Sequence, residues 1–101
     1  MAMFLVIVVR DGPRYDHAKP LEEQAGWEEH AAFMDGLVNE GFIVLGGPLA
    51  DERRVAHVIE ADSDDALRTR LAADPWAGTH LNVQSVDRWT IRLDGRVGTS
   101  S

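Results

Sequence analysis

Cysteine is absent from the sequence, which excludes disulfides, zinc–thiolate sites, iron–sulfur clusters and cysteine nucleophiles. Long apolar runs are absent too, because the run from Met3 to Val9 ends at Arg10, far short of the roughly 20 residues that span a bilayer. No basic segment precedes this run, as one would in a signal peptide. A chain of 101 residues is also too short for two cores of ordinary size. We therefore expect one cytoplasmic domain that does not associate with membranes.

Positively charged residues are few, ten against seventeen acidic ones, and the formal net charge is −7. Such a chain repels a phosphate backbone unless its basic residues gather on one face, and the sequence shows no cluster of them. We therefore expect no nucleic-acid partner. The histidines, at positions 17, 30, 57 and 80, lack the short spacing of metal-ligand pairs, so we expect no metal site and no cofactor.

The first part of the chain predicts a strand, a loop and a helix. Branched apolar residues from Met3 to Val9 predict a strand buried on both faces. Glycine and prolines among charged residues predict a long loop over residues 11–20. Apolar residues three or four positions apart predict a helix from Leu21 to Glu40, ended by Gly41. The stripe that faces the sheet would consist of Trp27, His30, Phe33, Met34, Leu37 and Val38.

The rest of the chain predicts a hairpin, a short helix and one or two further strands. Segments 42–45 and 55–59 predict two strands, the first stopped by Gly46-Gly47-Pro48. Ser63, followed by two aspartates, predicts the start of a helix that runs through Ala73. Alternating apolar residues predict a strand at 81–84 and a fifth strand, or its continuation, at 88–93.

This order of elements, β-α-β-β-α-β, indicates an α+β protein with a ferredoxin-like sandwich, in which two helices cover one face of an antiparallel sheet. We assign residues 1–94 to this single domain and residues 95–101 to a flexible tail. The other face of the sheet stays uncovered. Because the first two strands are apolar at every position, that face would expose an apolar patch unusual for a soluble monomer. A second copy of the chain is the expected cover, so we predict a homodimer.

His30 is the polar member of the apolar helical stripe, three residues after Trp27 and three before Phe33. Its imidazole should therefore point inward, toward the sheet. Two interpretations remain open: a core histidine with a satisfied hydrogen bond, or a histidine that lines a cavity and acts as a general acid or base. His57, within the third strand, and His80, at the rim of the sheet, are assigned structural roles.

Other candidate residues lie where predicted elements end. Asp74, before a proline, either makes a local turn or orients a neighbouring imidazole. Gly47 and Pro48, after the second strand, suit a plain turn or the close approach of a ligand to the backbone. Trp76 suits the core, an interface or the wall of an apolar pocket. Arg10, beside the long loop, is either a solvated charge or a contact for an anionic ligand.

Five features, taken in order, resemble the YCII-like family. They are the first strand ending in Asp11-Gly12-Pro13, the helical His30, the strand end Gly46-Gly47-Pro48-Leu49, the helix start Glu60-Ala61-Asp62-Ser63, and Asp74-Pro75-Trp76. The resemblance covers Met3 to Leu93 and implies a ferredoxin-like fold that forms a dimeric α+β barrel. It also implies an active site made of a helical histidine and the aspartate of an aspartate-proline-aromatic motif, here His30 and Asp74. Trp76 stands where the family often carries phenylalanine or tyrosine, which implies a different pocket shape.

The resemblance implies a small-molecule acid–base enzyme of lyase or isomerase type, in which His30 moves a proton and Asp74 orients it. Elimination on a hydroxylated organic substrate is one such reaction, because some relatives resemble dehydrohalogenase-type lyases. The alternative is a non-catalytic module of the same fold that binds or senses a small ligand or associates with a partner protein. Haem-handling relatives of the wider barrel group leave a third possibility, with His30 as axial ligand. The substrate-binding residues expected beside the pair are Arg10, Gly47, Pro48 and Trp76.

Overall fold

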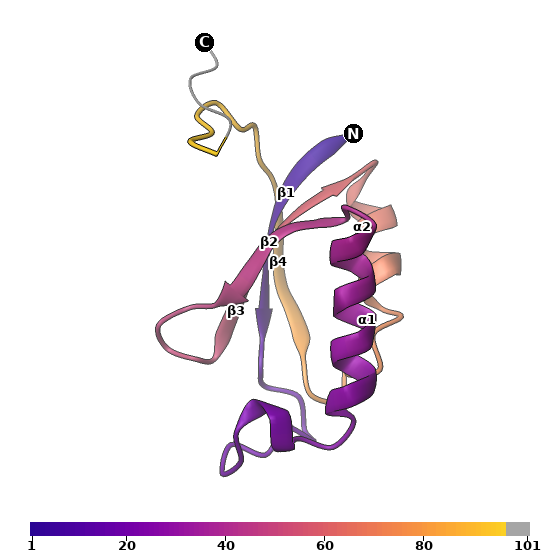
Figure 1. The fold of residues 1–101 in the computed structure, drawn as a ribbon, viewed down its shortest axis with the longest axis vertical. Coiled ribbons are helices and arrows are strands. Elements are labelled where there is room, and N and C mark those ends of the chain that lie inside the picture. Colours follow the sequence, from indigo (N-terminus) through magenta and orange to yellow (C-terminus); the bar gives the residue numbers. More distant parts are fainter. Residues whose placement is uncertain (97–101) are drawn as a thin grey trace.

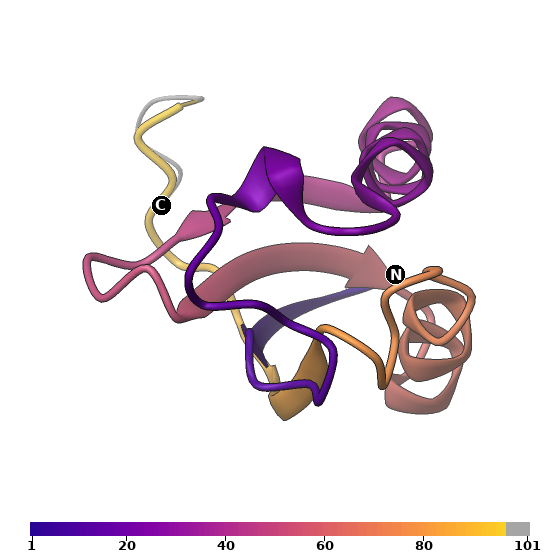
Figure 2. The ribbon, with the colours of Figure 1, turned by 90° about the horizontal axis from the view of Figure 1, so that it is seen from below.

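The computed structural model describes residues 1–96, which form a four-stranded antiparallel sheet with two α-helices on one face (Figures 1 and 2). The strand order is β2-β3-β1-β4, and each neighbouring pair is antiparallel. This is the ferredoxin-like β-α-β-β-α-β arrangement, so the fold class predicted from the sequence is confirmed. The elements are β1 (Ala2–Val9), α1 (Trp27–Asn39), β2 (Ile43–Pro48), β3 (Arg54–Ala61), α2 (Asp64–Leu71) and β4 (Asn82–Arg88).

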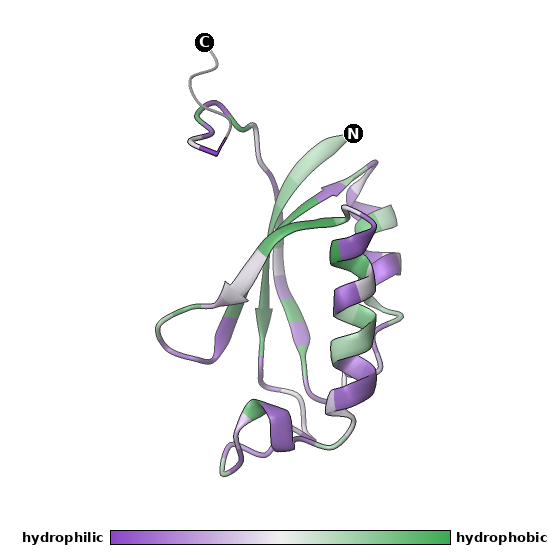
Figure 3. Cartoon of the chain, viewed as in Figure 1, coloured by the Kyte–Doolittle hydropathy of each residue, from purple (hydrophilic) through white to green (hydrophobic). Residues whose placement is uncertain are grey.

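The strand register divides the sheet into a helix-facing side and an open side. Val6 of β1 lies opposite His57 of β3, and both are buried beneath the helices. Leu5 lies opposite Val58 on the open side, and both are only half-buried in this single chain. β1 is hydrophobic along its length (Figure 3), but it is fully buried on one face only, not on both as predicted. The core comprises Phe4, Val6, Val8, Leu37, Phe42, Ile43, Ile59, Ala61, Leu67 and Leu71.

The helix predicted over residues 21–40 begins later than expected. Leu21–Glu23 form a single 3₁₀ turn, and α1 starts only at Trp27. Gly26, between them, has a φ of 79°, a left-handed conformation that interrupts helical backbone and that glycine adopts without steric cost. The other helix begins as predicted, because the hydroxyl of Ser63 accepts a hydrogen bond from the backbone N–H of Ala66 at 3.1 Å.

The segment Gly46-Gly47-Pro48 continues β2 and does not stop it, so that prediction is wrong. β2 is an edge strand, and an edge position tolerates proline because its missing N–H removes no hydrogen bond to a neighbouring strand. The register shifts between Ile43 and Leu45, where β2 carries an irregularity.

Residues 88–93 were predicted to form a fifth strand or to continue the fourth. That prediction is also wrong, because β4 ends at Arg88. The pairing goes on only through the backbone N–H of Trp89, which donates to the carbonyl of Met3 at 2.9 Å. β1 begins at Ala2 and offers hardly any further backbone to pair with. The side chain of Leu93 is accordingly 89% exposed. Residues 97–101 lie outside the described residues, so the flexible tail predicted for 95–101 stays a prediction.

Candidate active site

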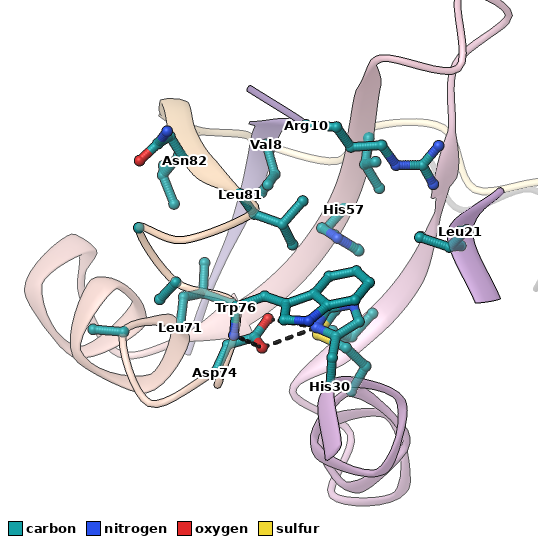
Figure 4. Close-up of a pocket in the computed structure, with 18 of the residues that line it drawn as sticks. Val8, Arg10, Leu21, His30, His57, Leu71, Asp74, Trp76, Leu81 and Asn82 are labelled. Atoms are coloured by element: carbon teal, nitrogen blue, oxygen red, sulfur yellow. Dashed lines mark hydrogen bonds and ion pairs between the residues drawn. The ribbon is translucent and has the colours of Figure 1, made fainter. Parts of the chain in front are cut away.

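A cavity of about 520 Å³ lies between the helix-facing side of the sheet and the helices (Figure 4). Arg10 and His57 line it from the sheet, His30 from α1, and Asp74 and Trp76 from the segment after α2. Its volume is in the range of sites that hold small organic molecules. Most of its other lining side chains are apolar, among them Val8, Leu21, Met34, Val55, Leu71 and Leu81.

His30 and Asp74, 44 positions apart in sequence, are in contact at one end of this cavity. Nδ1 of His30 lies 2.8 Å from one carboxylate oxygen of Asp74 and 2.9 Å from the other. The two side chains are 10% and 8% exposed. A carboxylate accepts hydrogen bonds, so the proton of a neutral imidazole is on Nδ1, which donates to Asp74. Nε2 is then the ring nitrogen with a free lone pair.

The backbone around Asp74 holds its carboxylate in place. The carboxylate accepts a second hydrogen bond from the backbone N–H of Trp76 at 2.8 Å, which is the local turn considered for this residue. The backbone N–H of Asp74 donates to the carbonyl of Leu71 at 3.1 Å, at the end of α2. The two interpretations of Asp74 are therefore compatible, since one carboxylate closes the turn and contacts the imidazole.

Trp76 is sandwiched between two histidine rings. The ring of His30 lies parallel to the indole at a centroid distance of 4.1 Å, and the ring of His80 covers the other face at 4.6 Å. The indole N–H donates to the backbone carbonyl of Ala25 at 2.9 Å, and the residue is 1% exposed. Because both faces of the indole are covered, Trp76 can offer a ligand only the edge of its ring.

His57 is a second histidine in the cavity. It is buried, and among the described residues its Nδ1 has no hydrogen-bond partner. Burial, helped by the nearby His30 and opposed by Asp74, lowers the pKa of His57 to about 4, so the ring is neutral at pH 7. A Cβ on Gly46, opposite it in β2, would lie 2.3 Å from this Nδ1. The glycine therefore leaves the space that the imidazole occupies.

Arg10 is buried, although it carries a permanent charge. Its Nη1 donates to the backbone carbonyl of Glu52 at 2.7 Å and lies 3.4 Å from the carboxylate of the same residue. Its Nε is buried and has no partner among the described residues. The side chain is 8% exposed, so Arg10 is not a solvated loop charge.

The remaining predicted residues divide between the cavity and its surroundings. Gly47 lines the cavity together with Arg10 and Trp76, whereas Pro48 is not among the lining residues. His80 is not at the rim but 5% exposed, so that prediction is wrong. A tight turn causes the difference, because the backbone N–H of His80 donates to the carbonyl of Trp76 at 3.1 Å and folds the imidazole onto the indole.

The position of His57 could have been predicted from the sequence, although this residue was assigned only a structural role. A usable signal was present, because Val55, His57 and Ile59 alternate along one strand and two of them are β-branched apolar residues. In a strand with one buried face, such residues share that face. The alternation therefore places the imidazole beneath the helices, where the structure has it.

Within residues 1–96, no group of three or more histidine, aspartate or glutamate side chains is arranged to hold a metal ion. None of the helices in this part of the chain has the length and apolar character needed to cross a membrane.

The fold and the cavity together define a class: a ferredoxin-like α+β protein with a buried histidine–aspartate pair beside an apolar cavity. The family model of the YCII-related domain matches residues 3–90, and the chain belongs to this family. The resemblance noted from the sequence is thereby confirmed. Searches of the curated proteins and of the solved structures found no match.

Proposed function

We propose that this protein is an acid–base enzyme of lyase or isomerase type that acts on a small organic molecule bound in the cavity. His30 takes and returns the proton, and Asp74 is its partner. The observation that carries the proposal is the 2.8 Å contact between Nδ1 of His30 and the Asp74 carboxylate, inside a cavity of about 520 Å³. Acid–base catalysis needs such a titratable group beside a site large enough for a substrate.

The reaction begins at Nε2 of His30, whose lone pair is free because Asp74 holds the proton on Nδ1. Nε2 takes a proton from an acidic C–H of the substrate. In an elimination, the electron pair of the broken C–H bond forms a C=C bond, and the leaving group departs from the adjacent carbon with its own bonding pair. In an isomerisation, Nε2 returns the proton to another carbon of the conjugated carbanion, and no group leaves.

The imidazolium formed in this step is stabilised by two neighbours. The carboxylate of Asp74 is its counter-charge, at hydrogen-bond distance. The face of the Trp76 indole, parallel to the ring at 4.1 Å, adds a cation–π attraction of roughly 0.5–2 kcal/mol. Both neighbours also fix the orientation of the ring, which reduces the entropy lost when the substrate is positioned.

We propose further that the protein acts as a homodimer whose second copy covers the open side of the sheet. Leu5, Ile7 and Val58 lie half-buried on that side, and Leu45 is 53% exposed. Burying roughly 500 Å² of apolar surface per chain, at about 25 cal/mol per Å², would favour association by on the order of 10 kcal/mol before the entropy of association is subtracted. The dimeric barrel implied by the family resemblance supports the same arrangement.

The enzymatic proposal is tested with a panel of small hydroxylated aromatic compounds, incubated with the protein in D₂O and followed by proton NMR. At least one compound is expected to lose a leaving group or to exchange a C–H for deuterium. His30→Gln should reduce that rate by about 100-fold or more. His17→Gln is the matched control, because His17 is exposed and does not line the cavity.

A different result would favour the binding module. If a compound binds the wild type and His30→Gln equally well, and neither protein exchanges its C–H groups, then His30 transfers no proton. Thermal melts of both variants show whether a lost activity reflects the missing imidazole or an unfolded chain.

A further inference from the structure

We propose that Arg10 and His57 form a subsite for the carboxylate group of the substrate, so that the ligand is a small apolar organic acid. This inference rests on the cavity being the substrate site of the proposed function. It concerns other groups of that cavity than the His30–Asp74 pair, and binding alone can test it.

The guanidinium of Arg10 has a free edge of the kind that carboxylates bind. Its Nη1 is engaged by the backbone carbonyl of Glu52 at 2.7 Å. Nε and Nη2, which lie on the other edge, make no hydrogen bond to any residue that the structure describes, and Nε is buried. Two parallel N–H groups on one edge match the two oxygens of a carboxylate. A buried donor without a partner is rare in native proteins and calls for one.

The charge of Arg10 is also poorly balanced. The one carboxylate at ion-pair distance among residues 1–96 is that of Glu52, and the two groups are 3.4 Å apart. Glu52 is 75% exposed at its side chain, whereas Arg10 is 8% exposed. Water screens the glutamate far more than the arginine, so the glutamate compensates the buried charge only weakly. A bound anion would complete that compensation.

His57 supplies a neutral donor to the same cavity. Its Nδ1 is buried against Gly46, so Nε2 is the nitrogen left for a ligand. A neutral imidazole with its proton on Nε2 donates one hydrogen bond and adds no charge. One guanidinium and one neutral imidazole therefore balance a single negative charge. A carboxylate has that charge, whereas a phosphate would bring additional negative charge toward Asp35 and Asp74, which also line the cavity.

The positions of these groups define how the acid would lie. Arg10 and His57 project from the sheet, and His30 projects from α1 beside Asp74 (Figure 4). The side chains around them are mostly apolar, so an apolar body attached to the carboxylate would be buried between the two polar groups. Such a molecule would present a carbon to His30 while its charged end stays at Arg10.

The test is an NMR titration of ¹⁵N-labelled protein with sodium benzoate, using benzamide as the uncharged molecule of similar shape. Benzoate is expected to shift the resonances of the His57 ring and of Arg10 Nε–H, and to bind about tenfold or more tightly than benzamide. Arg10→Gln should weaken benzoate binding by about tenfold and leave benzamide within about twofold. Arg53→Gln, an exposed arginine outside the cavity, is the matched control. Phenyl phosphate is expected to bind more weakly than benzoate.

Several outcomes would overturn the subsite. These are the absence of any shift at His57 and Arg10 with benzoate at tens of millimolar in the wild type, equal benzoate affinity in Arg10→Gln, or tighter binding of phenyl phosphate. The wild-type titration keeps the test decisive if Arg10→Gln does not fold. If Arg10 instead pairs across a subunit interface, Arg10→Gln would weaken association of the chains and leave benzoate affinity unchanged, which also overturns it.

His30→Gln separates this inference from the enzymatic proposal. Benzoate affinity should change by less than about threefold in that variant, because no hydrogen bond among the described residues joins Arg10 or His57 to the histidine–aspartate pair. Loss of benzoate binding in His30→Gln would place the anion at the pair and overturn the subsite. Intact benzoate binding with no turnover of any compound would leave the subsite supported and remove the enzymatic proposal.

Discussion

The imidazole of His30 and the indole of Trp76 lie almost parallel, with ring centroids 4.1 Å apart and an interplanar angle of 7°. Trp76 follows Asp74 by two positions, and its backbone N–H donates to the Asp74 carboxylate at 2.8 Å. One short turn therefore supplies both the carboxylate that binds Nδ1 of the histidine and the ring that fixes its plane.

Trp76→Phe should separate the stacking from the indole hydrogen bond. Phenylalanine keeps an aromatic face but loses the N–H that donates to Ala25, so we expect a cost of about 1–3 kcal/mol in the free energy of unfolding. Trp76→Leu loses the stacking as well, so we expect it to lower the free energy of unfolding by about 3–5 kcal/mol. Urea unfolding followed by circular dichroism measures both. Trp89→Phe, at a residue that is 45% exposed, should stay within about 0.5 kcal/mol, and an equal effect at both positions would contradict the stack.

Gly46→Ala should disturb the cavity, because the added Cβ would lie 2.3 Å from Nδ1 of His57. Overpacking of this kind typically costs about 1–3 kcal/mol. In the background of His57→Ala the same change should cost little, and a double-mutant cycle of thermal or urea unfolding measures the coupling. Gly47→Ala is the matched control, since nothing lies within 4 Å of the Cβ it adds. Additive effects of Gly46→Ala and His57→Ala would show that the two positions do not interact.

The stability of the protein should fall as pH is lowered from about 6.5 to about 4, partly through His57. The pKa of His57 is about 4 in the folded chain, whereas the ordinary pKa of a histidine, 6.5, applies to the unfolded chain. Between pH 4 and 6.5 the unfolded chain therefore binds more protons than the folded one. The neutral ring contributes on the order of 3 kcal/mol to the free energy of unfolding. This contribution is complete above about pH 6.5 and is lost as the pH falls to about 4. Urea unfolding across this range should show a smaller slope for His57→Gln than for the wild type. The exposed His17→Gln is the control, and identical slopes in all three proteins would refute a lowered pKa.

Asp74→Asn should change the tautomer of His30. In the wild type, the carboxylate accepts from Nδ1–H and selects the ring with its proton on Nδ1. An asparagine amide can donate as well as accept, so it no longer imposes that choice. The ¹⁵N chemical shifts of the two ring nitrogens report the tautomer directly. Unchanged shifts in Asp74→Asn would mean that the contact does not orient the imidazole.

Ile7→Asp should break the proposed dimer. The register places Ile7 on the open side of the sheet, opposite Ala56, whereas Val6 points into the core at 0% exposure. A charge at Ile7 would be buried without a partner in the dimer but solvated in a monomer. Light scattering is expected to show a dimer for the wild type and a monomer or aggregate for Ile7→Asp. Thr69→Asp, at an exposed position of α2 on the other face of the sheet, is the control, because it adds the same charge away from the proposed interface. A well-folded wild-type monomer at micromolar concentration would exclude the dimer.

The sequence by itself determined the α+β sandwich, and the family resemblance that it carries implied the two residues of the pair. Strand and helix periodicity, together with the Ser63 cap, are local signals that depend on neighbouring residues, and they located most elements to within a few positions. His30 stood out because one polar side chain interrupts an apolar stripe, and Asp74 because it precedes a proline after a helix. Local signals were misleading where a strand needs a partner. Residues 88–93 alternate as a strand does, but β1 has hardly any further backbone for them to pair with.

Only the tertiary structure decided which side chains share the cavity. His30 and Asp74 are 44 positions apart, and their contact depends on how two helices pack on one sheet. The burial of Arg10, the stacking of His80 on Trp76 and the place of His57 against Gly46 are likewise set by elements far apart in sequence or by a tight turn. Periodicity states which face of an element a residue occupies, but not which residue of another element meets it there, because that depends on strand register and helix packing.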